Sequence, residues 1–99
     1  MSQYKFGLTP RAGAELGHAS NWYEEQRKGL GSEFMLAVEA AFESVKRTPM
    51  LYPKIIGDAR RVLVKRFPFG IIFELFDDTI VILSIFHLKR RPESFGRKI

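Results

Sequence analysis

The basic residues of this 99-residue chain are concentrated in its last part, where their spacing favours the binding of anions. Residues 59–99 hold nine Lys or Arg against four Asp or Glu, a net charge of +5, whereas residues 1–58 are balanced at seven against seven. Seven of these nine cations form two groups: Arg60, Arg61, Lys65 and Arg66, then Lys89, Arg90 and Arg91. Clustered cations on a rigid support favour a polyanionic or acidic partner.

The first basic group lies on a predicted strand, which limits how many of its members can act together. Because neighbouring side chains of a strand point to opposite faces, Arg61 and Lys65 should share one face. Arg60 and Arg66 should then share the other. At most half of this group is therefore expected to line one site.

The first part of the chain predicts a strand followed by a helix. Residues 3–8 alternate apolar and polar side chains, the pattern of a half-buried strand. Thr9 offers a hydroxyl N-cap, and Pro10 suits the first turn of a helix. Apolar side chains then recur at helical spacing as far as Tyr23, so the helix is expected to run to about Lys28.

A second helix is expected after the break at residues 29–31, which contains two glycines. Ser32 can cap it, the apolar repeat runs from Phe34 to Val45, and the helix should end before Pro49. Two amphipathic helices joined by so short a break should fold back on each other as an antiparallel hairpin.

Three further strands are predicted after a loop at residues 50–53: Arg60–Phe67, Gly70–Phe76 and Thr79–His87. Their short junctions predict an antiparallel meander. The last two strands are apolar on both faces, and Ile72, Phe73 and Phe86 are interpreted as structural. One face should meet the helices. The other should be covered by the tail after His87, by the loop around Leu51 or, the interpretation we favour, by a partner.

The expected fold class is therefore α+β, with an N-terminal strand and an antiparallel helical hairpin packed on an antiparallel β-sheet. The element order is β-α-α-β-β-β, and a single domain is expected over residues 1–99. The chain has no cysteine and only two histidines, so we expect no disulfide, no metal site and no cofactor. No apolar run approaches the roughly 20 residues that span a bilayer, and a cytoplasmic location is expected.

Several short motifs resemble those of the RelE/ParE toxins at matching relative positions. They are Gly29-Leu30-Gly31 followed by Phe34, Pro49 followed by Tyr52-Pro53, the stretch from Arg60 to Phe73, and the end His87-Leu88-Lys89-Arg90-Arg91-Pro92. The resemblance covers nearly the whole chain. It implies a toxin of a type II toxin–antitoxin system with a RelE/ParE-like domain. It also implies a cognate acidic antitoxin that becomes ordered as it binds the toxin. Oligomers that contain both toxin and antitoxin are expected.

The family contains two kinds of toxin, and the resemblance leaves both open. ParE-like members poison DNA gyrase and need no nuclease residues, whereas RelE-like members cut messenger RNA on the ribosome. RelE-like enzymes often carry a tyrosine near the C-terminus, but the tail here has only Phe95 as an aromatic residue. The sequence therefore favours the ParE-like branch, a gyrase inhibitor associated with plasmid stabilization and growth inhibition.

The predicted effector surface consists of Arg61, Lys65, His87, Arg90 and Arg91. For the alternative function, an mRNA endonuclease, His87 would move protons while Arg61 and Lys65 hold the phosphate. A histidine that ends a buried strand also has a structural interpretation, because it often bonds to the backbone. A third alternative is a non-catalytic nucleic-acid-binding module. It is disfavoured because packing explains the aromatic residues near the cations.

Overall fold

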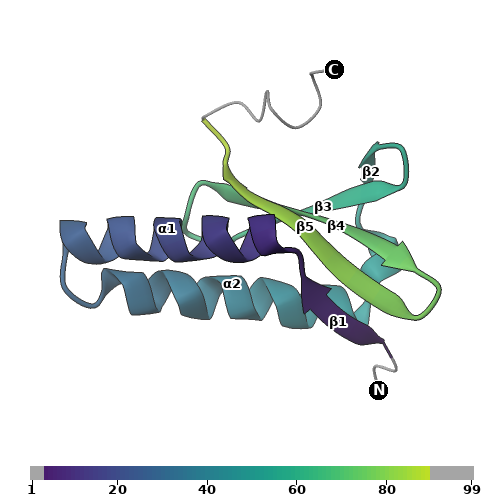
Figure 1. The fold of residues 1–99 in the computed structure, drawn as a ribbon, viewed down its shortest axis with the longest axis horizontal. Helices are drawn as coiled ribbons and strands as arrows, with labels where there is room; N and C mark the ends of the chain where they lie inside the picture. Colours follow the sequence, from purple (N-terminus) through teal and green to yellow (C-terminus); the bar gives the residue numbers. More distant parts are fainter. Residues whose placement is uncertain (1–3, 90–99) are drawn as a thin grey trace.

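A helical hairpin packs on one side of a five-stranded sheet (Figure 1). The computed structural model describes residues 4–89. Its helices are α1 (Pro10–Gln26), α2 (Leu30–Arg47) and a short 3₁₀ turn, η1 (Pro49–Leu51). Its strands are β1 (Lys5–Leu8), β2 (Lys54–Ile56), β3 (Ala59–Leu63), β4 (Phe69–Phe76) and β5 (Thr79–His87). The α+β class and the order of the predicted elements are confirmed.

The sheet differs from the prediction in being mixed. Its strand order is β1-β5-β4-β3-β2, and β3, β4 and β5 form the predicted antiparallel meander. However, β1 pairs with β5 in parallel, with Lys5 opposite Thr79 and Leu8 opposite Ile82. Strand β2 was not predicted: the expected loop covered residues 50–53, and the three residues of β2 show no apolar alternation and are all exposed.

The strand predicted over Arg60–Phe67 is also shorter than expected. It ends at Leu63, because Arg66 adopts a left-handed backbone conformation with φ 72° that a strand does not accept. The chain then turns, and the Phe69 amide donates to the Phe67 carbonyl at 2.8 Å. Lys65 and Arg66 therefore lie in a turn, and the predicted strand alternation does not set their directions.

The start of α1 was predicted correctly, and the start of α2 was not. The Thr9 hydroxyl accepts from the Ala12 amide at 3.1 Å, as a helix N-cap should. Helix α2 begins earlier than predicted, with Gly29 rather than Ser32 at its N-cap. Gly29 has φ 92°, and its amide donates to the Glu24 carboxylate at 2.9 Å. A side chain from the preceding helix thus satisfies this N-terminus.

The core lies between α2 and the inner face of the sheet. Helix α2 contributes Phe34, Val38 and Val45, each with no exposed surface. A ring cluster seals the end nearest the hairpin tip, with Tyr23, Phe34, Phe67 and Phe69 at centroid separations of 5.0–6.1 Å. Burial raises the pKa of the Tyr23 phenol, because the apolar cluster disfavours the phenolate.

The outer face of the sheet is apolar as well. Ile72 lies on it and is 1% exposed. A side chain at Gly70 would meet Phe86 and Leu88 at 3.1–3.3 Å, so these two residues cover the beginning of β4. Leu88, which follows β5, therefore helps to cover the outer face of the sheet, as one of the predicted alternatives proposed. The rest of the tail, including Arg90 and Arg91, lies outside the described residues.

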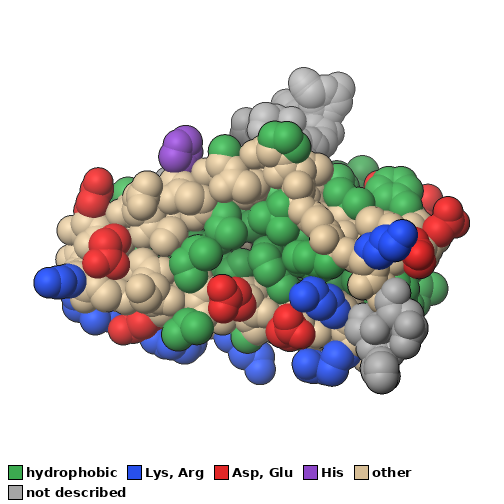
Figure 2. Space-filling view, turned by 60° about the horizontal axis from the view of Figure 1, so that its bottom comes forward, with side chains coloured by type: hydrophobic (Ala, Val, Ile, Leu, Met, Phe, Trp, Pro, Cys, Tyr) green, Lys and Arg blue, Asp and Glu red, His purple; other side chains and the backbone are tan. Residues whose placement is uncertain are grey.

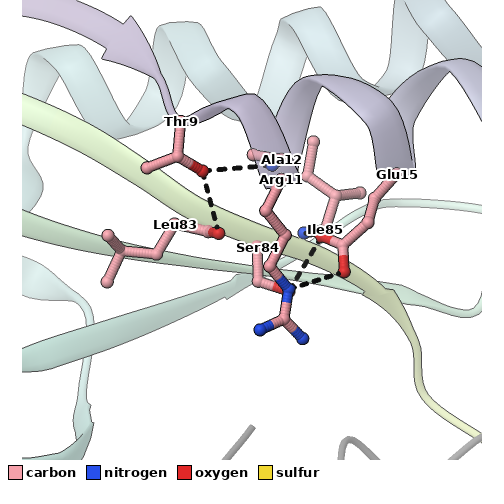
Figure 3. A network of polar contacts seen from close by, with 7 residues as sticks. All are labelled: Thr9, Arg11, Ala12, Glu15, Leu83, Ser84 and Ile85. Carbon is pink, nitrogen blue, oxygen red and sulfur yellow. Dashed lines mark hydrogen bonds and ion pairs between the residues drawn. The ribbon is translucent and has the colours of Figure 1, made fainter. Parts of the chain in front are cut away.

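Thr9 and Glu15 complete the sheet edge where β1 ends (Figure 3). Strand β1 pairs with β5 only as far as Ile82, although β5 continues to His87. Beyond that point the Thr9 hydroxyl donates to the Leu83 carbonyl at 3.2 Å. One oxygen of Glu15, Oε1, accepts from the Ile85 amide at 2.8 Å and from the Ser84 hydroxyl at 3.0 Å.

We predict that Glu15→Ala lowers the free energy of unfolding by about 1–3 kcal/mol, because it leaves the Ile85 amide and the buried Ser84 hydroxyl without an acceptor. Urea denaturation measures the change. Glu15→Gln, which keeps a side-chain carbonyl, should lose less, and Glu25→Ala on the exposed side of the same helix should lose little. Equal losses for all three variants would contradict the role of the Glu15 carboxylate.

Gly31 allows the two helices to approach. A Cβ atom at this position would lie 2.7 Å from the Ser20 carbonyl oxygen and 2.9 Å from Oε1 of Glu24. The carboxylate of Glu24 also accepts from the Gly31 amide at 2.9 Å, so the space is already filled by the group that holds the hairpin.

We predict that Gly31→Ala destabilises the protein by about 1–3 kcal/mol through overpacking. Gly17→Ala is the matched control, because no atom lies within 4 Å of the new Cβ, and it should stabilise the protein by roughly 0.5–1 kcal/mol. Thermal and urea unfolding of both variants test the pair. If both substitutions stabilised the protein, the close approach of the two helices at Gly31 would not be required for stability.

Candidate functional site

A groove of about 800 Å³ runs between α2 and the outer edge of β3. Helix α2 lines it with Glu33, Leu36, Ala37, Ala40, Ala41, Ser44 and Arg47. The opposite wall consists of Tyr52, Pro53, Arg61, Val62, Leu63, Lys65 and Arg66. The two walls come from segments separated in sequence, so only the folded chain forms this site.

Small side chains keep the groove open on the helix side. Ala37, Ala40 and Ala41 lie at helical spacing on the face of α2 that turns away from the other helix. Leu36 flanks them and is 65% exposed. An exposed leucine beside a row of alanines presents an apolar floor to which another chain can approach closely.

The strand side of the groove offers backbone groups for hydrogen bonding. The Arg61 amide points outward and donates to the Pro53 carbonyl at 3.1 Å, just before β2 begins. Since backbone direction alternates along a strand, the amide and carbonyl of Leu63 also point outward. No strand of the described sheet pairs with Leu63 on that side.

Non-covalent contacts join the two walls near each end of the groove. At one end, Nη2 of Arg66 lies 3.3 Å from Oε1 of Glu33. At the other, the hydroxyls of Ser44 and Tyr52 are hydrogen-bonded to each other, and the Tyr52 ring packs edge-on to Phe73. The part of α2 between these two contacts runs from Glu33 to Ser44.

The groove is strongly cationic around its apolar floor. Among its described lining residues, four are basic, Arg47, Arg61, Lys65 and Arg66, and Glu33 is the one acidic residue. In Figure 2, hydrophobic side chains lie in the middle of the view, and Lys and Arg side chains lie along the lower margin of the molecule together with several Asp and Glu side chains. An apolar floor with basic borders suits an amphipathic segment that carries carboxylates.

The structure brings together two of the five residues predicted for the effector surface. Arg61 and Lys65 both line the groove. His87 does not: it lies opposite Phe69, packs edge-on to that ring at 5.1 Å, and its Nδ1 accepts from the Lys89 amide at 3.1 Å. Arg90 and Arg91 lie outside the described residues.

Several further residues of the groove were not predicted as site residues. The sequence did not single out Arg47, Tyr52 lay in the loop predicted at residues 50–53, and Arg66 was placed on the face opposite Arg61. Arg60, by contrast, lies away from the groove lining and donates to the Tyr52 carbonyl at 2.7 Å. No local signal identifies these residues, because each joins the groove through a contact between distant segments.

Residues 4–89 contain neither a candidate metal site nor a membrane-spanning helix. In this part of the chain, no group of three or more His, Cys, Asp or Glu side chains is placed to bind a metal ion. None of its helices combines the length and apolar character needed to cross a membrane.

Comparison with known proteins identifies the fold. No family model and no curated protein matches the chain. A solved structure titled "Chromosomal ParDE TA system from P. aeruginosa" matches with a TM-score of 0.77. The match covers 86% of this chain and 96% of that chain at 17% sequence identity. The chain has a RelE/ParE-like fold. The resemblance inferred from the sequence motifs is confirmed at the level of the fold.

Proposed function

We propose that this protein is the toxin of a type II toxin–antitoxin pair, that it acts in the cytoplasm, and that a cognate acidic antitoxin neutralises it. The observation that carries the proposal is the cationic, apolar-floored groove beside the free edge of β3. The RelE/ParE-like fold supports it, since the matching structure is titled as a ParDE TA system.

The groove fits an extended segment of the antitoxin. Such a segment can pair with the outward amide and carbonyl of Leu63 and so add a strand to the sheet. Alternate side chains would then meet the apolar floor at Leu36 and Ala40, while carboxylates meet Arg61 and Lys65. The eleven helical steps from Glu33 to Ser44 correspond to roughly 16 Å of helix, the length of about five extended residues.

The proposed target is DNA gyrase, in line with the ParE-like branch that the sequence favours. Arg61 and Lys65, with His87, Arg90 and Arg91, are the proposed contacts. Since Arg61 and Lys65 line the groove, an antitoxin seated there would cover them and block the target directly. Neutralisation would then need no change in the shape of the toxin.

One observation favours a second candidate, cleavage of messenger RNA. Tyr52 lines the same groove as the cations Arg61 and Lys65, and a phenol and cations within one groove can move a proton and bind a phosphate. In this second candidate function, Tyr52 would replace the C-terminal tyrosine that RelE-like enzymes often carry and that this chain lacks. The hydrogen bond of Tyr52 to Ser44 and the position of His87 outside the groove favour gyrase as the target.

Induced expression of the chain alone in bacteria tests the function. Growth should stop, the SOS response should be induced, and cleaved DNA should accumulate. Codon-positioned cuts in messenger RNA without DNA damage would replace gyrase by the ribosome as the target. Normal growth with soluble, folded protein would contradict the toxin function.

We predict that Arg61→Glu with Lys65→Glu abolishes growth arrest, because the pair reverses the charge of the groove. Lys5→Glu with Lys28→Glu makes the same change in net charge at two exposed positions outside the groove and should leave toxicity intact. Thermal unfolding of both variants controls for folding. Equal toxicity of the two double variants would remove the groove from the mechanism.

A further inference from the structure

Glu33 has an unusual position in the groove. It is the one carboxylate among the lining residues in the described part of the chain, and it lies at one end of an otherwise cationic surface. Its side chain is 38% exposed, so it is open to exchange with solvent and ligands. A surface suited to acidic partners thus carries an acidic group of its own.

The contacts of Glu33 join three segments of the chain. Its Oε1 accepts from Nη2 of Arg27 at 3.4 Å and from Nη2 of Arg66 at 3.3 Å. Arg27 follows α1, Glu33 lies in the first turn of α2, and Arg66 lies in the turn between β3 and β4. The contact with Arg66 closes the end of the groove, because it connects the two walls.

The backbone of Arg66 directs its side chain to this position. Its φ of 72° is uncommon for a residue with a Cβ, and the conformation is held by the tight turn that leads to Phe67. The guanidinium lies 5.5 Å from the centre of the Phe67 ring, whereas the side chain as a whole is 68% exposed. Arg66 is therefore oriented toward the groove while its guanidinium remains reachable by a second anion.

We propose that Glu33 is an internal substitute for a carboxylate of the partner. When an acidic segment enters the groove, its carboxylate replaces Glu33 on Arg66, and the end of the groove opens. The exchange is feasible because an exposed ion pair contributes little to stability and a guanidinium offers several donors. This inference rests on the proposed function, since it specifies how the same groove receives its acidic partner.

The exchange affects acidic segments alone. A neutral segment offers nothing to replace Glu33 on Arg66, so the ion pair stays in place and does not compete with its binding. An acidic segment is accepted, but its affinity is lowered by the competition. Removing the Glu33 charge should therefore strengthen the binding of acidic ligands and leave neutral ones almost unaffected.

The test uses a fluorescein-labelled eight-residue peptide of alternating Glu and Leu, and a matched peptide with Gln in place of Glu. Fluorescence polarisation measures the binding of each peptide to the whole chain. Glu33→Gln should tighten binding of the acidic peptide by about two- to fivefold, the range expected for one exposed ion pair. Glu39→Gln, an exposed position of the same helix outside the groove, controls for net charge.

A double-mutant cycle separates exchange from general electrostatics. Arg66→Gln leaves α2 unaltered and should weaken binding of the acidic peptide, and in its presence Glu33→Gln should have no further effect. Equal tightening by Glu33→Gln and Glu39→Gln, or tightening by Glu33→Gln that persists with Arg66→Gln, would overturn the exchange but leave the proposed function standing. If no variant bound the acidic peptide, both the groove and the exchange would be contradicted.

Discussion

The structure depends on which groups form hydrogen bonds with the backbone along the outer edge of the long strand β5. Strand β1 has four residues and β5 has nine, so part of β5 has no neighbouring strand. Thr9 and Glu15 supply the missing hydrogen bonds from the beginning of α1. This attaches α1 to the sheet edge, and the helical hairpin then brings α2 against the inner face of the sheet. One face of α2 enters the core, and its other side is left to line the groove.

Two strands of the sheet, β5 and β3, have edges that are partly unpaired, and the two edges differ in what covers them. Beside β5 the edge is closed by side chains of α1. Beside β3, the outward backbone groups of Leu63 have no strand partner in the described sheet. A free edge invites another chain to pair with it, which proteins normally prevent. Here the free edge lies next to an apolar helix face and several cations, a combination that favours binding of a specific partner.

The charge of the groove comes from elements that are distant in sequence. Arg47 ends α2, Arg61 lies on β3, and Lys65 and Arg66 lie in the turn that follows. Their common orientation results from the position of α2 against the sheet and from the left-handed conformation of Arg66. Glu33 balances part of this charge in the free protein, so the groove is prepared for acidic ligands without leaving all its cations unpaired.

The sequence alone determined the elements whose signals are local. Thr9 and Pro10 set the start of α1, helical apolar spacing gave the hairpin, and short polar junctions gave the meander of β3, β4 and β5. Only the tertiary structure decided the parallel pairing of β1, the cap at Gly29, the end of β3 at Leu63, and the entry of Arg47, Tyr52 and Arg66 into the groove. The physical reason is that each of these depends on contacts between segments far apart in the chain, such as Glu33 with Arg66, and periodicity along one segment carries no information about them.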